Sequence, residues 1–68
     1  PNPVKTVLYV KNISKKANYK IYSAAGQLVS SGIILNNSID VRNLINGVYV
    51  IDIQDGNDIS AQKKFIKE

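Results

Sequence analysis

Residues 48–54 read VYVIDIQ, and large apolar or aromatic side chains recur at alternate positions along this stretch. Tyr49, Ile51 and Ile53 fall on one face of an extended chain, because side chains alternate between faces along a strand. The opposite face ends in two polar residues. This pattern is typical of a β-strand with one face on a hydrophobic core. We expect Tyr49 to be the central aromatic residue of that core.

The rest of the chain divides in the same way into short extended segments. Runs of β-branched, aliphatic and aromatic residues are separated by clusters of Gly, Asn, Asp and Ser, which are typical of turns. The runs cover residues 4–10, 19–23, 27–31, 33–35, 38–41 and 59–67. No window of about eleven residues has the apolar period of an amphipathic helix. We therefore predict an all-β fold, a small antiparallel β-sandwich of six to seven short strands, with a five-stranded barrel as the alternative.

Composition agrees with this prediction and limits the size of the fold. Ten Ile and seven Val favour strands, and eight Asn with four Gly favour turns. The 68 residues allow a single domain over residues 1–68. Pro1-Asn2-Pro3 cannot begin a strand ladder, since proline has no N–H and restricts the residue before it. We expect these residues to mark the start of the domain, and the domain to be one part of a larger protein without a preceding signal peptide.

The residue types exclude most catalytic and metal chemistry. The chain has no Cys and no His, so it offers no disulfide, no thiolate nucleophile and no imidazole base for its serines. Asp55 and Asp58 flank a turn glycine, and that loop is too short to supply the six or more oxygens that calcium takes. No glycine-rich phosphate loop is present. We therefore predict no catalytic residue, no metal site and no cofactor, and hence no enzyme. The sequence has no run of eighteen apolar residues, so we predict no membrane-spanning helix.

The basic charge raises the alternative of nucleic-acid binding. The formal net charge is +4, from nine Lys and Arg against five Asp and Glu. Nucleic-acid interfaces combine exposed aromatic side chains with cations on one face. Tyr19 and Tyr49 instead share their faces with isoleucines, so only Tyr22, beside Lys20, is available. We expect solvated lysines and no nucleic-acid partner.

Several motifs in a fixed order resemble one protein family. They are PNPV at residues 1–4, YKIYSAAGQLV at 19–29, IDVRNLINGVYVIDI at 39–53 and KKFIK at 63–67. In this order and spacing they resemble the type A C-terminal sorting domain of the type IX secretion system of the Bacteroidetes. The resemblance covers essentially the whole chain. It departs at Ser23, where the family often carries an acidic residue or Asn, and at Ile45, where a small residue or Pro is more typical.

The resemblance implies a targeting module with an Ig-like sandwich fold. Such a domain directs an N-terminal cargo protein, joined in cis, across the outer membrane. An outer-membrane translocon or shuttle reads it after transit through the periplasm. A sortase-like protease then usually removes it, and the cargo stays on the outer-membrane surface or becomes extracellular. The positions that match the family and that we interpret as structural are Pro1, Asn2, Pro3, Gly26, Gly47 and Tyr49. We expect both glycines to hold backbone geometry that a Cβ would strain.

The last predicted strand carries the candidate recognition residues, Lys63, Lys64, Phe65, Ile66 and Lys67. At a sheet edge, its unpaired backbone groups would accept an added strand from a translocon, or from a second copy of the domain. Phe65 and Ile66 cannot both point inward, so one is an apolar anchor, and the lysines would steer an acidic receptor. The alternative is that Phe65 belongs to the core and the lysines only keep the edge soluble.

A different class of function also fits the predicted fold. Ig-like accessory, spacer and carbohydrate-binding modules occur in secreted hydrolases and adhesins. A sugar site favours exposed aromatic residues, and tryptophan is absent from the chain. The position of the segment in its parent protein separates the two classes, because a sorting domain is C-terminal and a spacer is internal.

Overall fold

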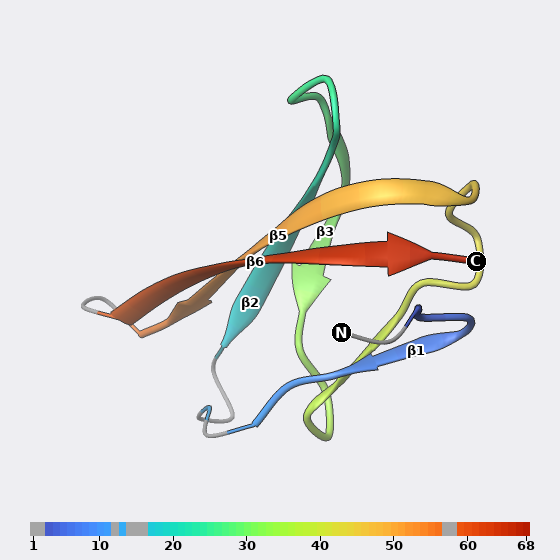
Figure 1. The fold of residues 1–68 in the computed structure, drawn as a ribbon. Helices are drawn as coiled ribbons and strands as arrows, with labels where there is room; N and C mark the ends of the chain where they lie inside the picture. The colour runs from blue at the N-terminus through green and yellow to red at the C-terminus, as the bar shows by residue number, and fades with distance from the viewer. Residues whose placement is uncertain (1–2, 12, 14–16, 57–58) are drawn as a thin grey trace.

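Six β-strands form the computed structural model, which describes residues 3–11, 13, 17–56 and 59–68 (Figure 1). Within that part of the chain there is no helix. The strands are β1 (Val7–Tyr9), β2 (Asn18–Ser23), β3 (Leu28–Ile33), β4 (Ser38–Asp40), β5 (Gly47–Asp55) and β6 (Ile59–Lys67). The prediction of an all-β fold is confirmed.

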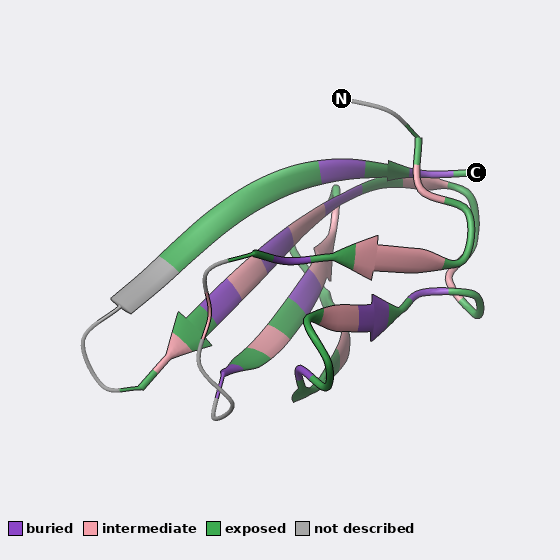
Figure 2. Ribbon diagram, turned by 90° about the horizontal axis from the view of Figure 1, so that it is seen from below, coloured by how far each residue is buried: buried purple, intermediate pink, exposed green. Residues whose placement is uncertain are grey.

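The strands form two antiparallel sheets. The larger sheet has four strands in the order β3-β2-β5-β6, and the smaller sheet pairs β1 with β4. β1 lies below the large sheet in Figure 1 and in front of it in Figure 2. β2 and β5 are the two inner strands of the large sheet. β3 and β6 are the edge strands of the large sheet.

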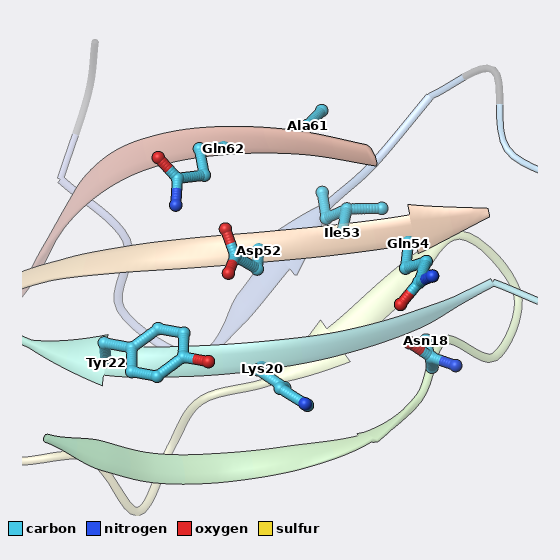
Figure 3. A pocket seen from close by; sticks show the side chains of 8 residues that line it. All are labelled: Asn18, Lys20, Tyr22, Asp52, Ile53, Gln54, Ala61 and Gln62. Atoms are coloured by element: carbon cyan, nitrogen blue, oxygen red, sulfur yellow. The ribbon is translucent and has the colours of Figure 1, made fainter. Parts of the chain in front are cut away.

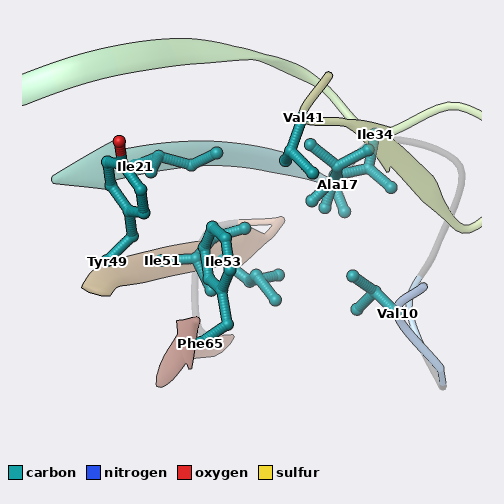
Figure 4. Packing of buried hydrophobic residues seen from close by; sticks show 10 residues of the cluster. Val10, Ala17, Ile21, Ile34, Val41, Tyr49, Ile51, Ile53 and Phe65 are labelled. Carbon is teal, nitrogen blue, oxygen red and sulfur yellow. The ribbon is translucent and has the colours of Figure 1, made fainter. Parts of the chain in front are cut away.

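A cluster of buried apolar side chains lies between the two sheets (Figure 4). Cross-strand pairs place Ile21 opposite Ile51, and Tyr49 opposite Phe65. The buried members are Val10, Ala17, Ile21, Ile34, Ile39, Val41, Tyr49, Ile51, Ile53 and Phe65. The predicted inward face of residues 48–54 is thereby confirmed.

Residues with positive φ form the tight turns. Gly26 has φ +85° in the turn between β2 and β3, where Ser23 N–H donates to Gln27 O at 2.8 Å. The register shifts after Ile21 in this hairpin, which fits a turn followed by a bulge. Asn36 and Asn37 have φ of 53° and 58°, the left-handed conformation at both central positions of a type I′ turn. Glycine and asparagine adopt this region at low cost.

The first predicted strand differs from the structure. Residues 4–10 do not form one strand, because Val4 pairs in parallel with Lys67 and β1 pairs with β4 only from Val7. The chain bends at Lys5 and Thr6 between these two pairings. The N-terminal segment thus passes from the edge of the large sheet to the small sheet.

Two further predictions need correction. The run 33–35 is not a strand of its own, since Ile33 ends β3 and Leu35 forms only an isolated bridge with Ser38. Gly47 does not have positive φ, and a Cβ at that position would lie 4.0 Å from its nearest neighbours. The expectation of strain is therefore right for Gly26 and wrong for Gly47.

Candidate functional site

The recognition residues predicted from the sequence lie on β6, at an edge of the large sheet. β5 pairs with β6 along all nine residues of the strand. Val4 N–H donates to Ile66 O at 2.7 Å from the opposite side, so the even-numbered backbone groups of β6 face away from β5. By this alternation the N–H and C=O groups of Gln62 and Lys64 also point outward. No described residue hydrogen-bonds to them, so this part of the edge is open.

The N-terminal segment closes the far end of the same edge. Besides the bond from Val4 N–H to Ile66 O, Glu68 N–H donates to Val4 O at 2.9 Å. Val4 therefore occupies the place that a neighbouring strand would take beside Lys67. Toward the C-terminus, the open part of the β6 edge therefore ends at Lys64.

The side chains of residues 63–67 divide between the core and the surface. Phe65 is 5% exposed, stacks on Tyr49 and belongs to the core, whereas Ile66 is 43% exposed on the outer face. Lys63 and Lys64 are exposed. The predicted alternation of Phe65 and Ile66 is confirmed, and Ile66 is the apolar residue that faces outward.

Lys67 differs from the other two lysines. It is only 5% exposed, and its Nζ donates to Glu68 O at 3.3 Å. Its partner across the ladder is Gly47, which has no side chain and leaves room for the lysine stem. Lys67 thus does not present a free cation to solvent as Lys63 and Lys64 do.

Ile66 is part of an apolar patch on the outer face of the large sheet. Cross-strand pairing brings Ile66 next to Val48, while Val50, Tyr22 and Leu28 lie in the adjacent row. Ile66, Val48 and Leu28 are each more than a third exposed. We call these five residues the outer-face patch. This patch was not predicted, although Val48 and Val50 on the second face of residues 48–54 are its signal in the sequence.

A polar hollow lies beside this patch on the same face (Figure 3). Lys20 and Asp52 are paired across β2 and β5, and Gln62 continues their row on β6. The carboxylate in the middle of the hollow opposes phosphate binding beside Lys20 and Tyr22. The described residues contain no cluster of three or more acidic groups able to hold a metal ion.

Comparison with protein families identifies the chain. The model of a family described as secretion system C-terminal sorting domain matches residues 1–68. The chain belongs to this family. Neither the curated proteins nor the solved structures contain a match.

The family gives the function of the sorting domain. It is the C-terminal sorting signal of the type IX secretion system, and it directs export across the outer membrane toward the cell surface or the extracellular space. This is not a catalytic family. Within the described part of the chain, no helix is long and apolar enough to cross a bilayer.

Tyr49 makes a contact that is compatible with an Ig-like fold of the sorting domain. It lies near the start of β5, and its hydroxyl donates to the backbone oxygen of Ile45, four residues upstream. The tyrosine corner of Ig-like sandwiches has the same form, a tyrosine near a strand start that hydrogen-bonds to upstream backbone. Tyr49 therefore combines a core ring with a hydrogen bond that fixes the preceding corner.

The remaining predicted structural positions lie at the N-terminus. Pro1 and Asn2 fall outside the described residues. Pro3 is exposed and directly precedes the Val4 pairing with β6. The N-terminal part of the sorting domain is therefore in contact with the strand that carries the candidate recognition residues.

Proposed function

We propose that the exposed part of β6 is the surface by which the secretion machinery recognises the sorting domain. Its position at a sheet edge supports this, because an edge strand can pair with a strand of a partner. Ile66 is the apolar anchor on the outer face, and Lys63 and Lys64 attract an acidic receptor. Phe65 holds the strand from inside, and Lys67 secures its end. The exposure of Ile66 on the same strand as the exposed Lys63 and Lys64 is the observation on which the proposal rests.

The partners follow from this role. The sorting domain, as a single unit over residues 1–68, carries a cargo protein in cis at its N-terminus through the periplasm. An outer-membrane translocon or shuttle of the type IX secretion system binds it, and a sortase-like protease removes it at the surface. The domain itself has no catalytic activity, no cofactor and no nucleic-acid partner in this proposal. The family match supports this role over that of an accessory or carbohydrate-binding module.

Export of a fused reporter tests the proposal with two matched isoleucines. Ile66 and Ile45 are both exposed, at 43% and 83%, but only Ile66 lies on β6. The domain is fused to a fluorescent reporter in a bacterium with a working type IX system, and reporter in the medium is measured. We expect Ile66→Asn to lower export strongly and Ile45→Asn to leave it near the level of the parent domain. Equal export by the two variants would contradict recognition through β6.

Deletion of residues 64–68 gives a broader test and needs a folding control. The deletion removes Phe65 from the core, so loss of export alone would not separate recognition from unfolding. Circular dichroism of the isolated variants shows whether the β-structure remains. We expect the exposed double variant Lys63→Gln with Lys64→Gln to stay folded and to export less reporter. Normal export by the folded deletion variant would refute the role of β6.

A further inference from the structure

One flank of the sandwich has an apolar groove between β1 and β6. The groove has a volume of about 190 Å³ and is lined by Leu8 and Val10 on one side and Phe65 on the other, with Ile51 and Ile53 at its floor. For comparison, an apolar cavity of about 150 Å³ accommodates a benzene molecule. The groove is therefore large enough for one aliphatic or aromatic side chain.

Unpaired strand edges border this groove on both sides. On β6 these are the outward backbone groups of Gln62 and Lys64. On β1, Val41 N–H donates to Thr6 O at 2.9 Å, so the even-numbered residues face β4 and the backbone groups of Val7 and Tyr9 face away from it. Both sheets thus end at this flank in open edges, and an extended segment can pair with either of them.

The opposite flank has a different lining. The tight turn at Asn36 and Asn37 leads there from β3 to β4. The hollow beside this turn has a volume of about 310 Å³, and the carboxylate residue Asp40 is among its lining residues. On the β1–β6 flank, the segment around Val4 pairs with the far end of β6, and Val10, Lys11 and Ile13 lie beside Ala61 and Lys63. The groove lies between these two contacts.

The charged side chains at the rim of the groove indicate the charge of the segment that could bind there. Lys63 and Lys64 line the groove, and none of its lining residues is a carboxylate. Lys63 is paired with Ile51 on the inner face, so its stem lies on the groove side of β6. A second copy adding its own β6 would bring lysines against lysines, which is unfavourable for like charges on neighbouring strands. An acidic segment has the complementary charge.

We propose that the groove between β1 and β6 is a docking site for an extended acidic segment of the secretion machinery. The segment pairs with β6 at Gln62 and Lys64 as a fifth strand of the large sheet. One of its apolar side chains fills the groove over Phe65, and its carboxylates, on the other face of the added strand, lie beside Lys64. This inference rests on the proposed recognition through β6, and it names the site and the chemistry of the partner.

Binding of a synthetic peptide to the 68-residue domain tests the groove directly. The probe is a blocked peptide of alternating acidic and β-branched residues, Ser-Glu-Val-Asp-Ile-Glu-Val-Ser. Amide shifts of the ¹⁵N-labelled domain are followed by NMR during titration. We expect saturable shifts that are largest at Gln62, Lys64 and residues 8–10, with slower hydrogen exchange of the Gln62 and Lys64 amides. Probes with serine in place of the apolar residues, or lysine in place of the acidic ones, should bind more weakly.

A matched pair of lysine variants tests the charge argument. Lys64→Gln should weaken binding of the probe about two- to five-fold, the range for an exposed ion pair, because the acidic face of the probe lies on the side of Lys64. Lys20→Gln removes the same charge from the outer face and should leave binding unchanged. Equal effects of the two variants would show that only the net charge of the domain matters and would overturn the site.

Other outcomes also overturn the inference without affecting the proposed function. Shifts centred on Lys20 and Leu28, or no saturation by the probe, would refute the groove. Concentration-dependent dimerisation in sedimentation, lost when Lys64→Pro removes an outward N–H group of β6, would assign the open edge to a second copy. If reporter export still depends on Ile66 in any of these cases, β6 remains the recognition strand. If export is independent of Ile66, the proposed function fails as well.

Discussion

Tyr49 and Phe65 stack across β5 and β6, with ring centroids 5.6 Å apart and planes inclined by 23°. Both rings are buried, at 8% and 5% exposure. Stacked pairs of this kind add about 0.5–1.5 kcal/mol to the stabilisation that comes from area burial. The pair attaches the edge strand with the exposed lysines to the centre of the sheet, so the geometry of the candidate site depends on the core.

Replacement of Phe65 should therefore affect folding more than any other change on β6. Phe65→Ala is expected to lower the free energy of unfolding by about 3–5 kcal/mol, the usual range when a buried phenylalanine is replaced by alanine. A domain of this size has a total stability of only about 3–10 kcal/mol, so much of the variant should be unfolded at room temperature. Urea unfolding followed by circular dichroism measures this. The neighbouring Ile66→Ala should change the free energy of unfolding by less than about 1 kcal/mol, and equal effects would contradict the assigned orientations.

The Tyr49 hydroxyl should contribute separately from its ring. Tyr49→Phe keeps the stacked ring but removes the hydrogen bond to Ile45 O, and we expect a loss of about 1 kcal/mol. Tyr9 is 75% exposed, so Tyr9→Phe is the matched control and should be nearly neutral. The urea midpoints of the two variants make the comparison. Equal midpoints for Tyr49→Phe and Tyr9→Phe would show that the hydrogen bond from the Tyr49 hydroxyl to Ile45 O does not stabilise the domain.

The large sheet could be predicted from the sequence because its side-chain pattern is local. The alternation of Tyr49, Ile51 and Ile53 gives the inward face of β5, and the bounds of β6 match the predicted residues 59–67. The inward position of Phe65 and the outward position of Ile66 follow from the same period of two. For these elements, burial in the folded state agrees with the local pattern.

Other features depend on contacts between distant residues and could not be predicted. Val4 is apolar like Val7 and Leu8, and its pairing with Lys67 separates it from β1. Lys67 is buried because its partner is Gly47, which no local pattern indicates. The groove between β1 and β6 requires knowledge of which edges remain open. These are properties of tertiary pairing and not of any one segment.

The two glycines of the family motif should respond differently to a methyl group. Gly26 has φ +85°, where an L-residue costs about 1–2 kcal/mol, so Gly26→Ala should destabilise by about that amount. Gly26→Asn should cost less, because asparagine tolerates this region. Gly47→Ala should be close to neutral, since its φ is not positive and a Cβ would have no contact closer than 4.0 Å. Thermal unfolding measures all three. The Gly26 assignment would be wrong if the two alanine variants melted together.

The ion pair between Asp40 and Arg42 at the end of β4 should make the free energy of unfolding depend slightly on pH. Hydrogen bonds donated by the Arg42 side chain and backbone lower the pKa of Asp40, with Arg42 Nη2 2.9 Å from Asp40 Oδ2. The folded-state pKa is below the unfolded value of about 3.9, so the stabilisation is present above about pH 4 and is lost as the pH falls through the folded pKa. Asp40→Asn keeps an acceptor for the Arg42 N–H but removes the charge.

The difference in urea midpoint between the parent domain and Asp40→Asn should therefore shrink from pH 7 to pH 2. It should also shrink in high salt, because both side chains are exposed, at 53% and 68%. A difference that stays constant over this pH range would show that the charge of Asp40 does not contribute.

The pairing of Val4 with the end of β6 should control how much of that edge is open. Val4→Pro removes the N–H that donates to Ile66 O, whereas Val4→Ala keeps it and also shortens the side chain. We expect Val4→Pro to lose about 1 kcal/mol more than Val4→Ala. Hydrogen exchange of the Glu68 amide is the local measurement, since this amide donates to Val4 O. The Glu68 amide should be protected in Val4→Ala and should exchange rapidly in Val4→Pro. Loss of the Val4 pairing would extend the open edge of β6 from Lys64 to Ile66. Equal protection in both variants would show that the N-terminal segment does not close this edge.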